Sequence, residues 1–171
     1  MKVLIWLVEG TWEGCVAAAR ALLPADAEVT LVYVADAEVP EAADGAMAGL
    51  LGRGRPGRDP GRRIAALSQT AAAQLLEAAA GRLGRPARRV LRAGRVEREV
   101  VKQAAGADLL VAARDGDRSR LGPRSLGPAT RFVVDHAPCQ VLLVWPDQVP
   151  KLDSMPPPPG RGHPPRPPHE R

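Results

Sequence analysis

Residues that could do chemistry gather in one stretch of the sequence, "ARDGDRSRLGPRSLGPATRF" (113–132). This stretch holds five arginines and two Gly-Pro pairs, and it follows the apolar run "ADLLVA". Arginine offers a planar fork of N–H donors that suits phosphate or carboxylate. Glycines allow the backbone to approach a ligand, and the start of a following helix offers free N–H groups to an anion. These features predict a loop that binds a phosphate-bearing small molecule.

The charge of the chain supports an anionic ligand in the same region. The formal net charge of the 171 residues is +5, and it is unevenly spread. Residues 1–50 carry two basic and eight acidic groups, whereas residues 51–146 carry eighteen basic and eight acidic groups. Such a distribution draws anions to the positive part of the chain, although a solvated basic face is the alternative interpretation. Nucleic acid is not an expected partner, because the few aromatic residues do not alternate with the basic runs.

A second glycine-rich run, "GRGRPG" (52–57), matches the GxGxxG pattern of dinucleotide sites, and Glu77 follows it at a suitable spacing. That fingerprint requires a preceding strand and a helix that opens inside it. Here a loop precedes the glycines, and Pro56 and Pro60 keep the chain irregular. We therefore interpret residues 52–63 as a basic surface loop.

The usual catalytic and metal-binding motifs do not occur. The sequence contains no GxxxxGK[ST], HExxH, paired CxxC or GxSxG motif, so we assign no catalytic residue and no metal ligand. The chain is not expected to be an enzyme, although weak ATP hydrolysis is left open. Cys15 is interpreted as a small buried core thiol, and His136 as a residue at a helix end, where positive charge is favourable.

The lengths of the apolar runs and the positions of the cysteines predict the localisation of the protein. The run after Lys2 is interrupted at Glu9, and no run approaches the length of a membrane span. Cys15 and Cys139 lie far apart and suggest no disulfide framework. We expect a reduced, cytoplasmic protein without a membrane partner.

The apolar pattern predicts alternating strands and helices. Short apolar or β-branched runs predict strands at 2–8, 27–35, 87–94, 107–113 and 139–145. Helical periodicity predicts helices at 12–23, capped by Thr11, at 64–83, from Val96 onward, and at 127–136 with Phe132 and Val133 facing inward. This alternation predicts an α/β fold, a doubly wound five-stranded and mainly parallel sheet with about four helices.

The chain divides into one domain and a tail. Residues 1–146 are expected to form the α/β domain, and the composition changes after Pro146, where "MPPPPGRGHPPRPPHER" has almost nothing to bury. Residues 147–171 are therefore expected to form a disordered, Pro-rich tail with polyproline II character. A proline-rich ligand for an unknown protein partner is the alternative.

In a doubly wound sheet, ligands bind beyond the carboxyl ends of the strands, where the strand order reverses. The loops after the first and fourth expected strands would form the walls of that site. At these loops the chain resembles the universal stress protein family. The stretch "EGT" (9–11) is similar to the acidic residue and Gly-Ser that end the family's first strand, lengthened by one residue.

The loop after the fourth strand carries the second part of the resemblance. The family pattern is Gly, two residues, Gly, nine residues, Gly-Ser, a helix and "PVLVV". This sequence has Ala113, two residues, Gly116, ten residues and Gly127-Pro128, followed by "ATRFVVDHAPCQVLLVW". The stretch "HAPCQVLLV" (136–144) is the most specific, and the resemblance covers residues 2–145.

The resemblance implies a dimeric protein from a family in which one branch binds ATP. It places contacts with the adenine and ribose of ATP, or of a related adenine nucleotide, near Leu7, Glu9 and Val34, beside Gly10 and Thr11. It places phosphate contacts near Ala113, Gly116, Gly127, Pro128 and Ala129. The side chains of Arg114, Arg118, Arg120 and Arg124 would add contacts with the phosphates. The implied homodimer would form through the fifth strand, Cys139 to Trp145.

Two departures from the pattern keep two functions open. Ala113 replaces a glycine, and Pro128 lacks the N–H and the hydroxyl that serine gives to phosphates. One function is a regulatory stress-response module that binds an adenine nucleotide weakly at the strand ends. The other is a nucleotide-independent dimeric scaffold that acts through protein contacts.

Overall fold

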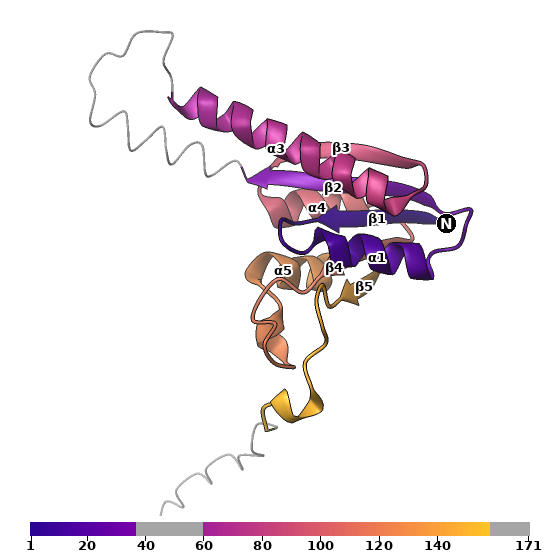
Figure 1. Ribbon diagram of the computed structural model, residues 1–171, viewed down its shortest axis with the longest axis vertical. Helices are drawn as coiled ribbons and strands as arrows, with labels where there is room; N and C mark the ends of the chain where they lie inside the picture. Colours follow the sequence, from indigo (N-terminus) through magenta and orange to yellow (C-terminus); the bar gives the residue numbers. More distant parts are fainter. Residues whose placement is uncertain (37–59, 158–171) are drawn as a thin grey trace, which may run out of the picture.

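The computed structural model describes residues 1–36 and 60–157, and the side chains from residue 67 onward in the second range. A single sheet in this part of the chain has the order β3-β2-β1-β4-β5, and all four strand pairs are parallel. The strands are β1 (Lys2–Leu7), β2 (Glu28–Asp36), β3 (Ala87–Gly94), β4 (Leu109–Ala113) and β5 (Gln140–Val144). The predicted five-stranded, doubly wound fold is confirmed (Figure 1).

Four α-helices in the described part cover the two faces of the sheet. They are α1 (Trp12–Leu22), α3 (Pro60–Leu83), α4 (Val96–Ala104) and α5 (Pro128–His136). One core joins the sheet to α1 and α3, and the other joins it to α4 and α5. None of these helices is both long and apolar enough to cross a membrane.

The start of α3 corrects the sequence analysis. Residues 60–63, which we expected in the basic loop, are helical, and Pro60 is the first helical residue. Proline suits that position because its missing N–H would have no helical partner there, and its φ is already helical. The rest of the expected loop (52–59), with its "GRGRPG" run, lies outside the described residues.

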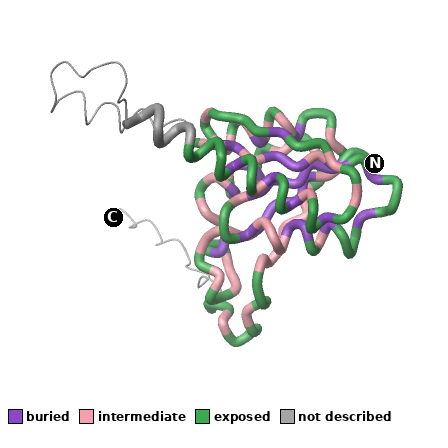
Figure 2. Tube along the Cα trace, turned by 45° about the horizontal axis from the view of Figure 1, so that its top comes forward, coloured by how far each residue is buried: buried purple, intermediate pink, exposed green. Residues whose placement is uncertain are grey.

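Burial of β1 on both faces accounts for its continuous apolar run. Val3, Ile5 and Leu7 belong to the core under α1 and α3, whereas Leu4 and Trp6 belong to the opposite core. Each is at most 3% exposed, as the buried centre of Figure 2 illustrates. Burying side chains of this kind contributes about 1.5–3 kcal/mol each, so β1 anchors both layers.

Two local expectations were wrong in detail. Thr11 is the N-cap residue of α1, but its hydroxyl donates to Val8 O at 3.2 Å and makes no cap hydrogen bond. Phe132 is only half-buried and stacks on His136 with a centroid distance of 4.0 Å, while Val133 is fully buried as expected. An aromatic stack at the end of α5 therefore replaces the expected core contact.

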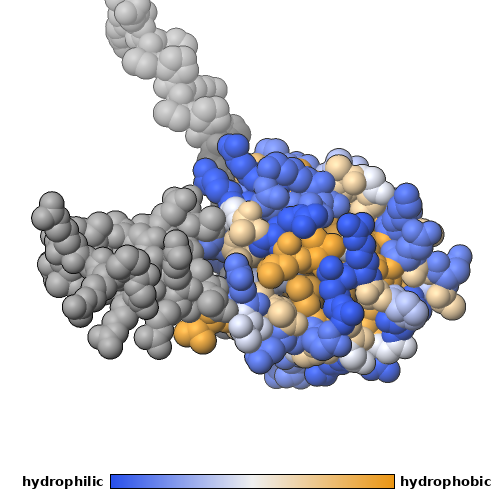
Figure 3. Space-filling view, turned by 90° about the horizontal axis from the view of Figure 1, so that it is seen from above, coloured by the Kyte–Doolittle hydropathy of each residue, from blue (hydrophilic) through white to orange (hydrophobic). Residues whose placement is uncertain are grey.

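The two edges of the sheet differ in charge. Edge strand β3 exposes Arg88, Arg89 and Arg92, and Arg89 forms an ion pair with Glu77 of α3. Charged side chains on an edge strand discourage pairing with another chain. The other edge strand, β5, carries no charged residue. Figure 3, which views the molecule from the side of α3 and β3, shows an apolar area ringed by hydrophilic side chains.

Part of the expected tail packs against the domain. After β5, a 3₁₀ turn, η2 (Leu152–Ser154), places Ser154 Oγ within 3.0 Å of Leu121 N, which donates to it. A Cβ added at Gly122 would lie 3.6 Å from the Pro156 ring, so these residues are also close. Residues 147–157 thus contact the segment between β4 and α5, a contact that the composition did not predict. Residues 158–171 lie outside the described part.

We predict that a chain ending at Pro150 keeps its sheet but loosens the segment around Leu121. The truncation removes the Ser154 acceptor and the Pro156 contact, so the Leu121 amide should exchange with solvent faster. Hydrogen exchange followed by mass spectrometry measures the difference. A chain ending at Pro157 keeps both contacts and is the matched control. Unchanged exchange at residues 119–123 after truncation at Pro150 would contradict the prediction.

We also predict that Cys15 is chemically inert in the folded protein. Its side chain is fully buried, and burial raises the pKa of the thiol to about 12. Because alkylation requires the thiolate and physical access, iodoacetamide at pH 8 should modify Cys15 only after denaturation. Peptide mass spectrometry should find the half-buried Cys139 modified before Cys15. Equal rates for native and denatured Cys15 would show that its surroundings open readily.

Candidate functional site

The candidate site lies where the chain order in the sheet reverses, at the carboxyl ends of β1 and β4. These strands are neighbours, with β2 beyond β1 and β5 beyond β4. The connections that leave them turn to opposite faces of the sheet, and ligands of such sheets bind beside these strand ends. The β1 loop (8–11) and the β4 loop (114–127) are joined by Arg118, whose Nη1 donates to Gly10 O at 3.4 Å.

The β1 loop is a tight turn that leads directly into α1. The backbone N–H groups of Thr11 and Trp12 both donate to Val8 O, at 3.1 and 3.0 Å. Gly10 has a φ of +73°, a conformation that side chains other than glycine rarely adopt. The expected "EGT" stretch is therefore the turn itself, and its glycine is required by the backbone.

Glu9 and Tyr33 form a polar pair at the ends of β1 and β2. The Tyr33 hydroxyl donates to Glu9 Oε1 at 3.1 Å. Burial raises the pKa of Tyr33, and the negative charge of Glu9 and this hydrogen bond raise it further. Tyr33 therefore remains protonated at neutral pH and can act as a donor. It was missed by the sequence analysis, although its position one residue before Val34 places it at the expected strand end.

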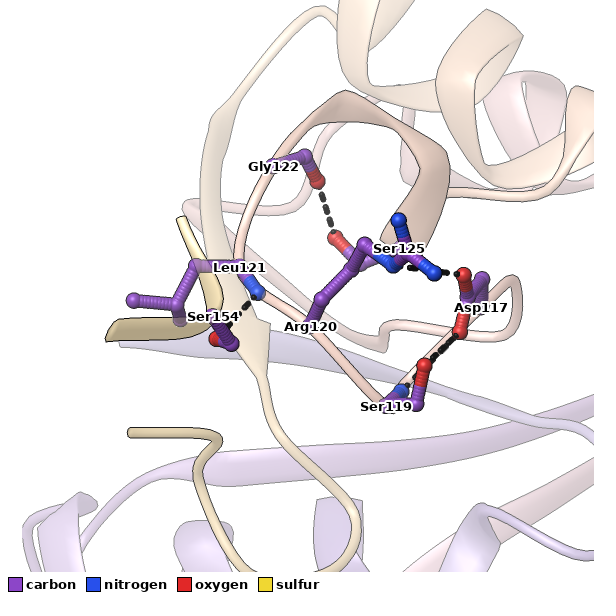
Figure 4. A network of polar contacts seen from close by, with 7 residues as sticks. All are labelled: Asp117, Ser119, Arg120, Leu121, Gly122, Ser125 and Ser154. Carbon is purple, nitrogen blue, oxygen red and sulfur yellow. Dashed lines mark hydrogen bonds and ion pairs between the residues drawn. The ribbon is translucent and has the colours of Figure 1, made fainter. Parts of the chain in front are cut away.

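The β4 loop closes on itself through backbone hydrogen bonds. Gly116 N donates to Ser125 O at 2.9 Å, and Asp117 N donates to Arg124 O at 2.8 Å. A Cβ at Gly116 would lie 2.3 Å from Arg124 O, so only glycine fits this close approach. Ser125 is fully buried, and its hydroxyl donates to Gly122 O at 2.7 Å (Figure 4).

Asp117 organises the exposed tip of the same loop. Its Oδ1 accepts hydrogen bonds from the Ser119 hydroxyl and backbone N–H, and its Oδ2 lies 3.4 Å from Arg120 Nε (Figure 4). The hydrogen bonds from Ser119, with the charges of Arg120 and Arg124, lower the pKa of Asp117. The tip therefore carries a permanent carboxylate among its arginines.

Arg114 anchors the beginning of the β4 loop. Its guanidinium lies over the Trp145 ring, 4.7 Å from the centroid, and Nη1 donates to the buried hydroxyl of Ser125. Stacking of this kind uses the planar face of arginine and leaves fewer of its donors for a ligand. Arg114, which we expected to contact phosphate, thus has a role inside the fold.

Asp115 is a second residue of this site that sequence analysis missed. Its Oδ1 accepts a hydrogen bond of 2.8 Å from the backbone N–H of Gly127, the N-cap residue of α5. A carboxylate at a helix N-terminus is favoured by the partial positive charge there. Because the two residues are twelve positions apart and no local pattern connects them, only the folded loop reveals the pair.

Two buried polar atoms of the described residues have no hydrogen-bond partner, and they flank the β4 loop. They are Arg114 Nε, where the loop begins, and Thr130 Oγ1, in the first turn of α5. A buried polar group without a partner costs about 1–3 kcal/mol. The polar groups around the loop are therefore incompletely satisfied by the chain itself.

The remaining site residues divide into buried and accessible groups. The side chains of Leu7, Val34 and Ala113 are at most 6% exposed, and Leu7 and Val34 lie in opposite cores. Any contact of these three with a ligand falls to their backbone. Arg120, Arg124 and Pro128 are exposed, Ala129 packs partly against the core, and Arg118 forms an ion pair of 3.1 Å with Asp147.

A hollow elsewhere on the molecule is not lined by any of the expected site residues. A hollow of about 790 Å³ lies at the amino ends of the strands, lined by Lys2, Glu28 and Arg88 among others. Parallel sheets bind ligands at the carboxyl ends of their strands, which is the other end of the sheet from this hollow. Within residues 1–36 and 60–157, no three His, Cys, Asp or Glu side chains are grouped so that they could hold a metal ion.

Solved structures with the same fold include several universal stress proteins. A universal stress protein in complex with cAMP is 15% identical and superposes with a TM-score of 0.56, over 86% of this chain and 98% of that one. A family protein from Arabidopsis thaliana with AMP bound is 17% identical, with a TM-score of 0.53 over 91% and 95% of the two chains. UspA from Lactobacillus plantarum is 22% identical, with a TM-score of 0.52 over 84% and 97%.

Comparison of the sequence with family descriptions gives the assignment. No curated protein sequence matches the chain significantly. The family model of the universal stress proteins matches residues 15–144, which include most of α1, the β4 loop and β5. The five-stranded parallel sheet agrees with the structural matches. The chain therefore belongs to the universal stress protein family.

Proposed function

We propose that this protein is a cytoplasmic, non-catalytic regulatory module of the stress response that binds an adenine nucleotide weakly. The ligand would lie at the carboxyl ends of β1 and β4, beside the β1 loop and the β4 loop. Its base would lie toward Glu9 and Tyr33, and its phosphate toward the start of α5. Relatives of the same fold are known in complex with cAMP and with AMP, which supports an adenine ligand.

The observation that carries this proposal is the junction of the two loops at the reversal of strand order. Arg118 spans it from the β4 loop to Gly10 O, and the exposed Arg120 and Arg124 lie on the same β4 loop. Charge-assisted hydrogen bonds from arginine to phosphate are among the stronger polar contacts in proteins. A phosphate-bearing ligand therefore finds both a polar wall and positive charge here.

Binding should be weak because the backbone contributes little to a phosphate. Pro128, the first residue of α5, has no N–H, and the N–H of Gly127 already donates to Asp115. Affinity would then rest on side-chain charge, which salt screens. Weak, salt-sensitive affinity would distinguish this protein from relatives whose loops have a serine at the position of Pro128.

A second candidate function is a nucleotide-independent dimeric scaffold. The contrast between the sheet edges favours it, since β3 exposes three arginines whereas β5 carries no charged residue. An uncharged edge strand invites pairing with a second copy, and identical patches then meet in a symmetric dimer. This candidate needs no nucleotide and is therefore the alternative to the first function.

We predict that replacing Arg120 and Arg124 by Gln weakens the binding of ATP, ADP and AMP about tenfold or more, because both side chains are exposed on the β4 loop. Arg114 and Arg118 are left intact, since they hold the loop. Isothermal titration calorimetry measures the affinities at low and high salt. Arg20→Gln, in the last turn of α1, makes a comparable exposed change and should leave binding unchanged.

Pro128→Ser should act in the opposite direction. It restores an N–H and a hydroxyl at the start of α5, a gain of about 1 kcal/mol or somewhat more toward a charged phosphate. The same titrations test it. An absence of heat with every nucleotide for the parent and both variants would exclude the nucleotide function and leave the scaffold.

We predict that the protein forms a homodimer through β5. The substitution Leu143→Arg should convert this dimer to a monomer. The half-buried Leu143 lies near the end of β5, where a new charge should block strand pairing. Light scattering after size-exclusion chromatography gives the mass, and circular dichroism confirms folding. Leu91→Arg, the same replacement on edge strand β3, should remain dimeric. A parent protein that is monomeric at micromolar concentration would contradict this prediction.

A further inference from the structure

The start of α5 already holds an anion, the carboxylate of Asp115. Gly127 N donates to Asp115 Oδ1 at 2.8 Å, and Pro128 has no N–H to offer. Among the groups at this helix start, the Gly127 N–H is thus occupied and the next N–H is missing. A phosphate that approaches the Gly127 N–H therefore meets the negative charge of Asp115.

The glycine at position 127 serves this internal contact. A Cβ there would lie 2.9 Å from both carboxylate oxygens of Asp115, closer than nonbonded carbon and oxygen atoms come. Gly127 therefore allows the carboxylate to reach the helix start. The glycine that matches the family's phosphate motif has a reason to be present without any ligand.

The nearby positive charge is also partly balanced from within. Arg118 forms an ion pair with Asp147, Arg120 lies beside Asp117, and Arg114 is stacked on Trp145. The unpartnered buried atoms Arg114 Nε and Thr130 Oγ1 belong to the residue before Asp115 and to the first turn of α5. A ligand that satisfies this region must bring hydrogen-bonding groups without bringing much additional negative charge.

We propose that Asp115 determines the specificity of the site by occupying the phosphate position at α5, so that the site selects adenine ligands of low negative charge. Adenosine and a cyclic mononucleotide fit this class, whereas nucleoside polyphosphates are disfavoured by repulsion from the carboxylate. This inference rests on the proposed function of adenine binding beside the β1 and β4 loops. It adds the residue that sets which adenine ligands bind there.

Asp115→Asn is the sharpest test, because it keeps an oxygen acceptor for the Gly127 N–H and removes only the charge. Calorimetry with adenosine, cAMP, AMP and ATP gives the order of affinities. The parent should bind adenosine and cAMP better than ATP. The variant should bind ATP roughly tenfold more tightly than the parent does, with adenosine changed less than twofold. Asp135→Asn, in the last turns of α5, makes the same change of net charge and should leave the order unaltered.

A second measurement tests Asp115 without a nucleotide. Titration with inorganic pyrophosphate, followed by amide NMR, should shift the Gly127 and Thr130 signals of Asp115→Ala and leave those of the parent in place. Circular dichroism shows that each variant is folded. This probe depends only on the helix start and not on adenine recognition.

The outcomes separate the two proposals. If adenine ligands bind but Asp115→Asn leaves their order unchanged, the specificity role of Asp115 is wrong and the proposed function stands. If no adenine ligand binds while pyrophosphate shifts the Gly127 signal of Asp115→Ala, the adenine function is wrong and occupation of the phosphate position by Asp115 stands. If neither binds to any variant, both are wrong.

Discussion

Burial of β1 on both faces is the constraint on which the rest of this structure depends. Ile5 and Leu7 require a helical layer on one side, and Leu4 and Trp6 require a layer on the other. Because parallel strands reach each layer through right-handed crossovers, the chain must leave β1 in one direction and β4 in the other. The position of the β1 and β4 loops is therefore a consequence of core packing, and their polar residues are added at a place that the apolar core already fixes.

The β4 loop is stabilised by the protein's own polar groups. The hydroxyl of the fully buried Ser125 accepts a hydrogen bond from Arg114 and donates one to Gly122 O. Ser154, from beyond β5, accepts the Leu121 N–H. A loop with so many internal hydrogen bonds needs no ligand to be folded. Its arginines have two roles, because some stabilise the loop and others are exposed to solvent. Sequence spacing alone does not distinguish these two roles.

Periodicity predicted the strands and helices well because burial imposes it directly. The run at residues 87–94 became β3 without adjustment, and the expected helix at 127–136 differs from α5 by one residue. The site was predicted less completely. Leu7 and Val34 were placed at the correct strand ends, but alternation along a strand buries their side chains in opposite cores. Asp115 went unrecognised because its partner is set by loop closure, which leaves no local pattern.

The close approach of Asp115 to Gly127 links the substitutions that these two positions can accept. Any side chain at position 127 meets the carboxylate, so the glycine can be replaced without collision only after the aspartate has changed or moved. Gly116 is held in the same way by Arg124 O. Both glycines of the motif would thus persist in a lineage that had ceased to bind any ligand. In this chain, the two glycines follow from the shape of the loop, whether or not a ligand binds.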